Sequence, residues 1–449
     1  MPFTRRDFLR VLGMSAAACA APAGAFNMAA AQGKRPPNII VILADDQGSL
    51  DANCYGAEDL YTPNIDALAK RGVRFTQFYV GAPVCSPSRA CLLTGKYPHA
   101  AGVPGNVGQD NGLPNEQVTL AEVFKSAGYK TACFGKWHLG HKPELSPNAQ
   151  GFDEFFGHKH GCIDNYSHFF YWSGPNRHDL WRNEDMVWED GEFFPDLVVR
   201  ESHRFIEENQ DQPFFMFLPF NVPHYPYQGT EAHRERYEDM EHPRNKYAAF
   251  ISTMDEKIGE VMGKVDELGL REDTIIVYLS DHGHSTEERA FFGGGWAGPY
   301  RGHKFTLWEG GIRVPCIISW PGTLPEGETR DQLGHSMDWL PTLAALAGVD
   351  PGDHKIDGLD ISGVIREGAG SPHEVVQWDS GGSWAVREGP WKLVANGHGT
   401  THRGKKLEKV PFFLSNLDED VTETVNLADD HPEMVRRMRD LHREWKRSL

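Results

Sequence analysis

The sequence predicts an α/β fold with a large mixed, mostly parallel sheet sandwiched by helices, and a smaller C-terminal α+β subdomain containing an antiparallel sheet. Three observations lead to this prediction: apolar runs alternate with helix-like segments, the runs are apolar throughout, and shorter strand-like pieces follow residue 365. The 449 residues suffice for two or three structural units. A content of 40% hydrophobic and 24% charged residues is typical of a soluble globular protein.

The main sheet is predicted from four apolar runs, each followed directly by polar residues. They occupy residues 38–43, 129–134, 214–220 and 274–279. Runs that are apolar at every position indicate strands covered on both faces, as in a parallel sheet. Helix-like segments lie between them at residues 64–71, 119–127 and 247–268. Because ligands bind beyond the carboxyl ends of such strands, the polar residues after the four runs are expected to meet in one site.

The chain after residue 365 is predicted to form a small antiparallel sheet with one packing helix. The strand-like pieces lie at residues 375–378, 384–387, 391–395 and 411–414. In the final helix the apolar residues fall on one stripe, made of Met434, Met438, Leu441 and Trp445. The predicted domains are therefore an N-terminal domain at residues 32–365, which carries the site, and a C-terminal subdomain at residues 366–449.

Residues 1–31 have the three parts of an export signal, which are Arg5 with Arg6, an apolar stretch at residues 8–25, and small residues at 29–31. The paired arginines resemble a twin-arginine signal, so we expect the twin-arginine export machinery as a partner and a periplasmic or secreted mature protein. A general secretory signal is the alternative. Outside this segment no apolar run approaches the about 18 residues of a membrane span.

The charge and the cysteines limit the partners that the chain can have. The net charge of −18 becomes about −20 once residues 1–31, with three arginines and one aspartate, are removed. Such a surface repels nucleic acid and acidic membranes, and an anionic ligand needs locally placed Lys, Arg and His. Six of the seven cysteines lie beyond Cys19, without paired metal-type spacing, and their disulfide pairing does not follow from the sequence.

The segment at residues 84–95 (VCSPSRACLLTG) is predicted to be a helix that begins at Cys85. Pro87 suits a first helical turn, and Gly95 suits the position just past a helix end. Cys85 then meets the free N–H groups of the helix N-terminus, with Arg89 one turn further on. These features favour an anion or a nucleophile with developing negative charge, whereas a small buried hydrophobe is the alternative for a cysteine considered alone.

The CSPSR segment at residues 85–89 resembles the signature of the type I, cysteine-type sulfatases of the alkaline phosphatase-like superfamily. In that family a maturation enzyme oxidises the cysteine to formylglycine. The similarity extends over almost the whole chain after residue 31 and includes residues 44–48 (ADDQG), 62–80, 88–99 (SRACLLTGKYPH), 128–140 (GYKTACFGKWHLG), 281–283 (DHG), 301–315 and 337–349. The resemblance implies an arylsulfatase-like enzyme that hydrolyses organic sulfate esters through a formylglycine hydrate and a divalent metal.

The resemblance also implies a metal site formed by Asp45, Asp46, Asp281 and His282. Three carboxylates at strand ends repel one another unless a cation lies among them, and oxygen ligands select hard divalent ions. Calcium is the family expectation. Many members have asparagine at the position of His282, and because a nitrogen ligand suits calcium less well, magnesium or a transition metal is the alternative. The alternative to a metal site is that Asp45 and Asp46 only cap the end of a strand.

Five cations are implied to bind the sulfate and to manage protons, namely Arg89, Lys136, His138, His224 and Lys304. Lys136 is expected to hold the hydrate and the sulfate, and His138 to act as the base that releases the sulfate. His224 and Lys304 are the candidates that stabilise or protonate the leaving oxygen. A hydrated aldehyde allows this release, whereas a serine at residue 85 would at best trap a sulfated enzyme.

The substrate class and two rival functions stay open in the sequence. Seven aromatic residues crowd one insert, where they either stack on sugar rings or pack an irregular loop: Tyr166, Phe169, Phe170, Tyr171, Trp172, Trp181 and Trp188. Sulfate esters of carbohydrates or of aryl alcohols are both expected substrates. The rivals are a phosphoester or phosphonate ester hydrolase of the same superfamily, and a non-catalytic protein that binds sulfated glycans if Cys85 is not matured.

Overall fold

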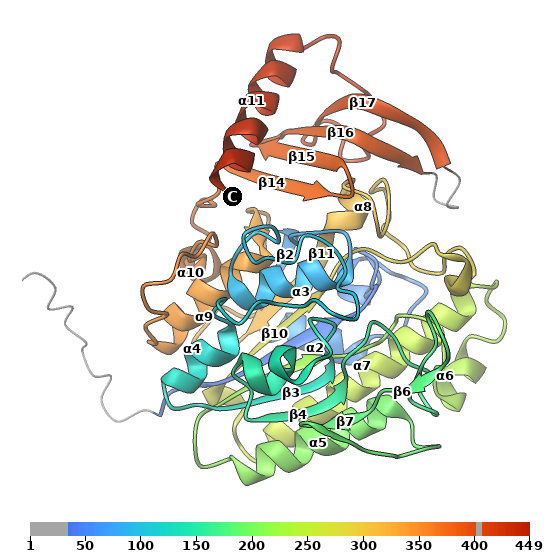
Figure 1. The fold of residues 1–449 in the computed structure, drawn as a ribbon, viewed down its shortest axis with the longest axis vertical. Coiled ribbons are helices and arrows are strands. Elements are labelled where there is room, and N and C mark those ends of the chain that lie inside the picture. The colour runs from blue at the N-terminus through green and yellow to red at the C-terminus, as the bar shows by residue number, and fades with distance from the viewer. Residues whose placement is uncertain (1–34, 401–405) are drawn as a thin grey trace, which may run out of the picture. The chain divides into compact units, whose positions relative to one another are not determined.

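The computed structural model describes residues 35–400 and 406–449, so the predicted signal peptide at residues 1–31 lies outside the described residues. In this part of the chain, eleven strands form one sheet in the order β12-β2-β11-β10-β1-β9-β3-β4-β7-β8, with β13 beside β2 (Figure 1). The strands are β1 (Asn38–Ala44), β2 (Val73–Tyr79), β3 (Lys130–Lys136), β4 (Glu154–His158), β7 (Trp181–Arg182), β8 (Asp185–Met186), β9 (Phe214–Pro219), β10 (Thr274–Ser280), β11 (Arg313–Ser319), β12 (Glu328–Arg330) and β13 (Gly334–His335).

The centre of this sheet is parallel and contains the four strands that the apolar runs predict. β1 pairs in parallel with β10 on one side and with β9 on the other, and β9 pairs in parallel with β3. Ala44 lies opposite Ser280, and Leu43 lies opposite Pro219, so the carboxyl ends of these strands are level with one another. β11 is antiparallel to both of its neighbours, which makes the sheet mixed.

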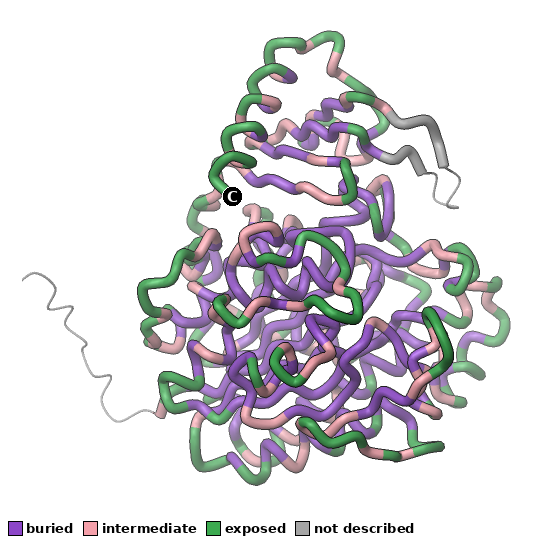
Figure 2. The backbone as a smooth tube through the Cα atoms, in the orientation of Figure 1, coloured by how far each residue is buried: buried purple, intermediate pink, exposed green. Residues whose placement is uncertain are grey.

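Helices cover both faces of the sheet because its strands are apolar on both sides. Along β1, Ile39 and Val41 pack into one core, whereas Ile40 and Ile42 pack into the other. The helices that contribute to the first core include α3 (Cys85–Thr94), α4 (Leu120–Ser126) and α9 (Trp339–Ala347). Another three contribute to the second core, namely α2 (Pro63–Lys70), α5 (Phe194–Glu208) and α7 (Arg244–Glu267). Figure 2 shows the resulting buried centre with exposed residues at the periphery.

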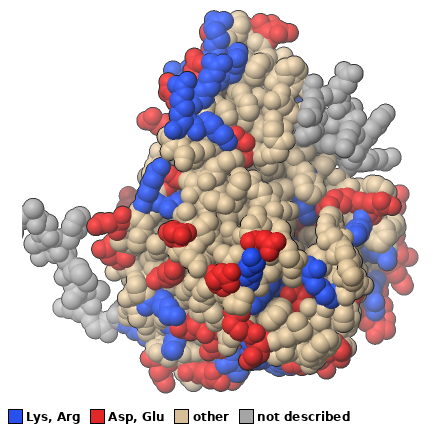
Figure 3. Space-filling model, in the orientation of Figure 1, with Lys and Arg blue, Asp and Glu red and all other residues tan. Residues whose placement is uncertain are grey.

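A four-stranded antiparallel sheet and one long helix complete the described chain. The sheet has the order β14 (Val375–Ser380), β15 (Ser383–Glu388), β16 (Trp391–Thr400) and β17 (Lys406–Asn416), and α11 (Pro432–Ser448) packs against it. Met438 of the predicted stripe is fully buried, while Met434 and Leu441 flank it. Figure 3 shows Lys and Arg side chains gathered along α11. The predicted fold class is thus confirmed, whereas the domain boundary at residue 365 stays a prediction.

Several element boundaries differ from the predicted ones. Lys136 closes β3 instead of following it, because parallel pairing with β4 continues to Lys136 opposite His158. α7 begins at Arg244, three residues before the predicted start, since its polar first turn carries no apolar periodicity. β16 and β17 extend beyond the predicted pieces, as the pairing continues through polar and glycine residues to Thr400 opposite Lys406.

The remaining helices and strands are short. They are α6 (Glu231–Arg236), α8 (Glu309–Ile312), α10 (Ser362–Glu367) and a two-stranded ribbon of β5 (Phe169–Phe170) and β6 (Arg177–His178). Among the described residues, no helix is long and apolar enough to span a bilayer. The six cysteines in the described ranges are all free thiols.

Candidate active site

The polar residues that follow the central strands meet at one edge of the sheet. Asp45 follows β1, Lys136 ends β3, His224 lies five residues beyond β9, and Asp281 follows β10. All ten residues that the sequence predicts for the site are buried there: Asp45, Asp46, Cys85, Arg89, Lys136, His138, His224, Asp281, His282 and Lys304. The convergence expected from the four apolar runs is therefore present.

Helix α3 brings Cys85 to this edge. It begins at Cys85, after the extended residue Val84, and ends at Gly95, which has a left-handed φ of 65° that glycine adopts without strain. The side chain of Ser88 joins the helix to β10, because its hydroxyl donates a hydrogen bond of 2.5 Å to the backbone carbonyl of Asp281. Cys85 thus lies at the positive end of the helix dipole, as predicted.

Three charged or polar groups surround the sulfur of Cys85. The Lys136 ammonium lies 3.5 Å from this sulfur and 2.6 Å from Oδ2 of Asp45. Nε2 of His282 lies 3.3 Å from the sulfur, and Oδ1 of Asp45 lies 3.8 Å from it. Any reactive group at residue 85 is therefore in direct reach of a base, an acid and a carboxylate.

The guanidinium of Arg89 joins three of the strand ends. It is fully buried, and its NH1 donates to the backbone carbonyl of Lys136 at 2.8 Å. Its NH2 donates to Oδ2 of Asp281 at 3.0 Å and lies 3.7 Å from Oδ1 of Asp45. Because a planar guanidinium has donors in fixed directions, these contacts fix the relative positions of the three segments.

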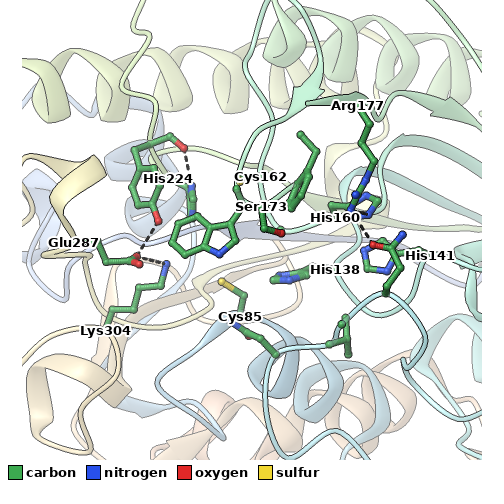
Figure 4. Close-up of a pocket in the computed structure, with 18 of the residues that line it drawn as sticks. Cys85, His138, His141, His160, Cys162, Ser173, Arg177, His224, Glu287 and Lys304 are labelled. Atoms are coloured by element: carbon green, nitrogen blue, oxygen red, sulfur yellow. Dashed lines mark hydrogen bonds and ion pairs between the residues drawn. The ribbon is translucent and has the colours of Figure 1, made fainter. Parts of the chain in front are cut away.

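A second group of charges surrounds Asp46, which has a positive φ of 66°. The Lys304 ammonium lies 2.9 Å from Oδ1 of Asp46, and Nε2 of His282 lies 3.5 Å from the same oxygen. Nε2 of His224 lies 3.8 Å from Oδ2. Lys304 also lies 3.4 Å from Glu287, which accepts a hydrogen bond from the hydroxyl of Tyr225 (Figure 4).

Burial and charge act in opposite directions on the acidic groups of the site. Burial raises the pKa of the Cys85 thiol, but the neighbouring Lys136 and Lys304 outweigh it and lower this pKa to about 6. Burial also raises the pKa of Asp45, and here Lys136 and the other nearby cations hold it well below its usual value. For Asp46 burial prevails over Lys304 and raises the pKa to about 8.

The histidines of the site differ in protonation. Burial, followed by Lys136, holds the pKa of His138 well below its usual value, and burial with Lys304 does the same for His224. Nδ1 of His224 lies 2.7 Å from the carbonyl oxygen of Tyr225 and must carry the proton, so that Nε2 of the neutral ring is an acceptor. His282 is different, because Asp281 and the Cys85 sulfur overcome burial and raise its pKa to about 9.

The donor set fits a divalent cation. One ligand atom each of Asp45, Cys85, Asp281 and His282 lies within 4.8 Å of the others, and all four residues are buried. The carboxylate of Asp46 faces the same space through its contact with His282. Buried carboxylates at this spacing repel one another, and a divalent cation would offset that repulsion. The donors do not distinguish calcium from magnesium.

The site opens into a pocket of about 820 Å³, which includes solvent at its mouth. Figure 4 shows Cys85 at the base of this pocket, with Lys304 and Glu287 on one side and His160 and Arg177 on the other. Of the aromatic insert, Phe170 and Trp172 line the pocket. Trp181 and Trp188 instead contact Lys159 and His178, so much of the insert is packing.

Sequence reasoning missed three residues that contact the predicted set. Glu287 pairs with Lys304, and Tyr225 contacts both Glu287 and His224. Gly161 leaves room for the ring of His138, since a Cβ there would lie 2.8 Å from that ring. Tyr225 could have been found from the sequence, because it directly follows the predicted site residue His224. Glu287 and Gly161 reach the site from loops that carry no recognisable motif.

Comparison with known proteins gives a consistent result. A family model described as Sulfatase matches residues 37–349. Arylsulfatase A of Homo sapiens is 33% identical, over 91% of this chain and 87% of that protein. N-acetylgalactosamine-6-sulfatase of Sus scrofa is 34% identical, over 74% of this chain and 67% of that protein. The crystal structure of Ps i-CgsB in complex with k-i-k-neocarrahexaose has a TM-score of 0.81 at 28% identity, covering 92% of this chain and 93% of that chain.

The lowered pKa of Cys85 predicts selective alkylation in protein whose cysteine is unmodified. The thiolate is the reactive form, and its population increases as the pH increases through the pKa of about 6. With iodoacetamide and a chelator present, we expect the alkylation rate of Cys85 to be half-maximal near pH 6. Cys162 lines the same pocket, but burial raises its pKa to about 11, so it should stay unreacted at pH 7. Peptide mapping measures both, and a shared pH dependence would contradict the electrostatic account.

Proposed function

We propose a mechanism for this chain on the premise that it belongs to the sulfatase family. It is a type I enzyme of the alkaline phosphatase-like superfamily and hydrolyses sulfate esters. Residue 85 performs the reaction as formylglycine, and the substrates are sulfated carbohydrates. The observation that carries this proposal is the contact of Cys85 with Lys136, His282 and Asp45 at the base of an open pocket. No other described cysteine combines a pocket position with a lowered pKa.

The chemistry requires two oxygens on one carbon, which a cysteine side chain lacks. A hydrated formylglycine supplies one oxygen for attack on sulfur and a second for release of the sulfate as the aldehyde reforms. A formylglycine-generating maturation enzyme is therefore a required partner. Lys136, 3.5 Å from the present sulfur, would donate to the oxygen that replaces it. Arg89 is held by one backbone acceptor and one side-chain acceptor, and its positive charge lies beneath the sulfate.

Proton transfer is divided between Lys304 and His138. Lys304 is the proton donor to the leaving oxygen, because its contacts with Asp46 and Glu287 hold its pKa well above the usual value despite burial. His224 does not act as the acid, since its neutral ring presents an acceptor Nε2; it accepts a hydrogen bond from the leaving alcohol once Lys304 has protonated the oxygen. His138 is neutral, lies beside Cys85 in Figure 4, and is the base for sulfate release.

A divalent metal is bound by Asp45, Asp46, Asp281 and His282. Calcium is the proposed ion, with magnesium or another divalent metal as the alternative. When bound, it polarises a sulfate oxygen and lowers the cost of deprotonating the hydrate. The carboxylates suit this role because they are buried and lie close to one another.

Carbohydrate sulfates are the proposed substrates, with aryl sulfates as the alternative. The support comes from the named relative that acts on N-acetylgalactosamine 6-sulfate and from the similar structure that holds a neocarrahexaose. Trp172 and Phe305 line the pocket and are 46% exposed, so both rings offer apolar surface to a sugar. The proposed location is the periplasm or the exterior, on the basis of the twin arginines Arg5 and Arg6.

Parallel assays with nitrophenyl sulfate and nitrophenyl phosphate test the proposed reaction. We expect a large preference for the sulfate, and the Cys85→Ala variant should lose activity by about 1,000-fold or more because it cannot form the aldehyde. Cys91→Ala is the matched control, since Cys91 is buried in the same helix and does not line the pocket. A preference for phosphate, or equal losses in both variants, would overturn the proposal.

Replacing Lys304 should affect substrates according to their leaving groups. Nitrophenolate leaves readily without a proton, so Lys304→Ala should lower kcat for nitrophenyl sulfate only slightly. A sugar alkoxide needs the proton, and kcat for a sugar sulfate should fall by about 100- to 10,000-fold. Lys304→Arg preserves the charge and tests for partial recovery. Equal losses for both substrates would show that Lys304 serves in binding rather than in proton donation.

A further inference from the structure

The pocket wall opposite Lys304 holds a cation that the sulfatase reaction does not use. Arg177 lies there with Gln109, His141 and His160, and all four residues line the same pocket as Cys85. Figure 4 shows the ring of His138 between Cys85 and this group. A ligand whose sulfate lies at Cys85 would therefore extend its remaining atoms past His138 toward Arg177.

The guanidinium of Arg177 is held in one position by three contacts. Arg177 pairs with Phe170 across the ribbon of β5 and β6, and its Cζ lies 4.6 Å from the centre of the Phe170 ring. Its NH2 donates to Oε1 of Gln109 at 2.9 Å and to Nε2 of His160 at 2.8 Å. These bonds use both hydrogens of NH2, and Nε is buried, so the two donors of NH1 remain for a ligand.

The contact with His160 is itself fixed by a buried carboxylate. Arginine only donates, so Nε2 of His160 must accept, and the proton of the neutral ring is on Nδ1. Nδ1 donates to Oδ2 of Asp179 at 2.8 Å, and Asp179 is 1% exposed. Asp179 accepts three further bonds, from the Trp181 indole and from the backbone N–H groups of Lys159 and His160. The Asp179 carboxylate thus fixes the position of the His160 ring, and this ring in turn fixes Arg177.

Within residues 35–400 and 406–449, no carboxylate forms an ion pair with Arg177. Arg89 and Arg182, by contrast, each pair with a carboxylate. Apart from the guanidinium, the neighbours in this wall are neutral or aromatic: Gln109, His141, His160 and Phe170. For His141, burial followed by the neighbouring His160 lowers the pKa to about 4, so its ring is neutral as well. A guanidinium in a pocket that has no direct ion pair, and whose NH1 donors are unused, favours an anion.

We propose that Arg177 binds a second negatively charged group of the substrate, a sulfate or a carboxylate, while the scissile sulfate lies at residue 85. The substrate is then a carbohydrate with at least two anionic groups. This inference rests on the proposed function, since it assumes that the scissile sulfate is bound at Cys85. Arg177 acts in specificity and does not take part in the chemical step.

Competitive inhibition of nitrophenyl sulfate hydrolysis tests this proposal without knowledge of the natural substrate. The three probes are an N-acetylgalactosamine monosulfate, the corresponding disulfate, and the monosulfate linked to a uronic acid. The wild-type enzyme should bind one of the two doubly charged probes at least about tenfold more tightly than the monosulfate, because a charge-assisted hydrogen bond from NH1 of Arg177 is added. The disulfate and uronate arms identify whether the second group is a sulfate or a carboxylate.

The Arg177→Gln variant should lose this difference, while its kcat and KM for nitrophenyl sulfate change less than about threefold. Arg177→Lys preserves the charge but lacks the planar guanidinium that Gln109 and His160 hold in place, so it should recover only part of the difference. Arg443→Gln on α11 is the control for loss of one positive charge and should match the wild type.

The outcomes separate this inference from the proposed function. If the wild type hydrolyses nitrophenyl sulfate but binds the three probes equally, or if Arg177→Gln weakens all three equally, the second anion site is wrong and the sulfatase proposal stands. If the wild type does not hydrolyse nitrophenyl sulfate or any probe, the proposed function fails first.

Discussion

The structure of the site depends on the mutual compensation of buried charges. Six ionisable side chains share a space closed to solvent on most sides, namely Asp45, Asp46, Asp281, Arg89, Lys136 and Lys304. Each carboxylate contacts one cation at 2.6–3.0 Å, and removal of any partner would leave a buried charge uncompensated. Once a divalent cation is bound by the carboxylates, as proposed, the lysines and the arginine become available to an anionic sulfate, which explains how an acidic protein accepts such a substrate.

The strands of the main sheet could be predicted where every residue of a run is apolar, because such a run indicates burial on both faces of the sheet. The four apolar runs gave β1, β3, β9 and β10, and the rule that ligands bind at the carboxyl ends of parallel strands gave the position of the site. Strand order could not be predicted, because it depends on pairings such as that of β1 with β9, about 170 residues away. The full length of β16 could not be predicted either, because its outer part pairs through glycine and polar residues that have no apolar pattern.

The site could be predicted where short motifs place residues directly on strand or helix ends. Cys85 and Arg89 share one helical turn, so their relation follows from local geometry. Glu287 and Arg177 could not be found in this way, because their roles arise from loops and a ribbon that only tertiary packing brings to the pocket. The aromatic insert was ambiguous for the same reason, and the structure divides it between the pocket, as for Trp172, and packing contacts, as for Trp188.

The central claim is that the strand ends gather acids and bases around a chemically altered residue 85. Mass analysis of the tryptic peptide spanning residues 75–89 of native, active protein tests it most directly, since trypsin cleaves after Arg74 and Arg89. The account predicts the mass of formylglycine in place of cysteine, together with reaction of the peptide with an aldehyde reagent. An unmodified Cys85 in protein that still turns over sulfate esters would contradict it.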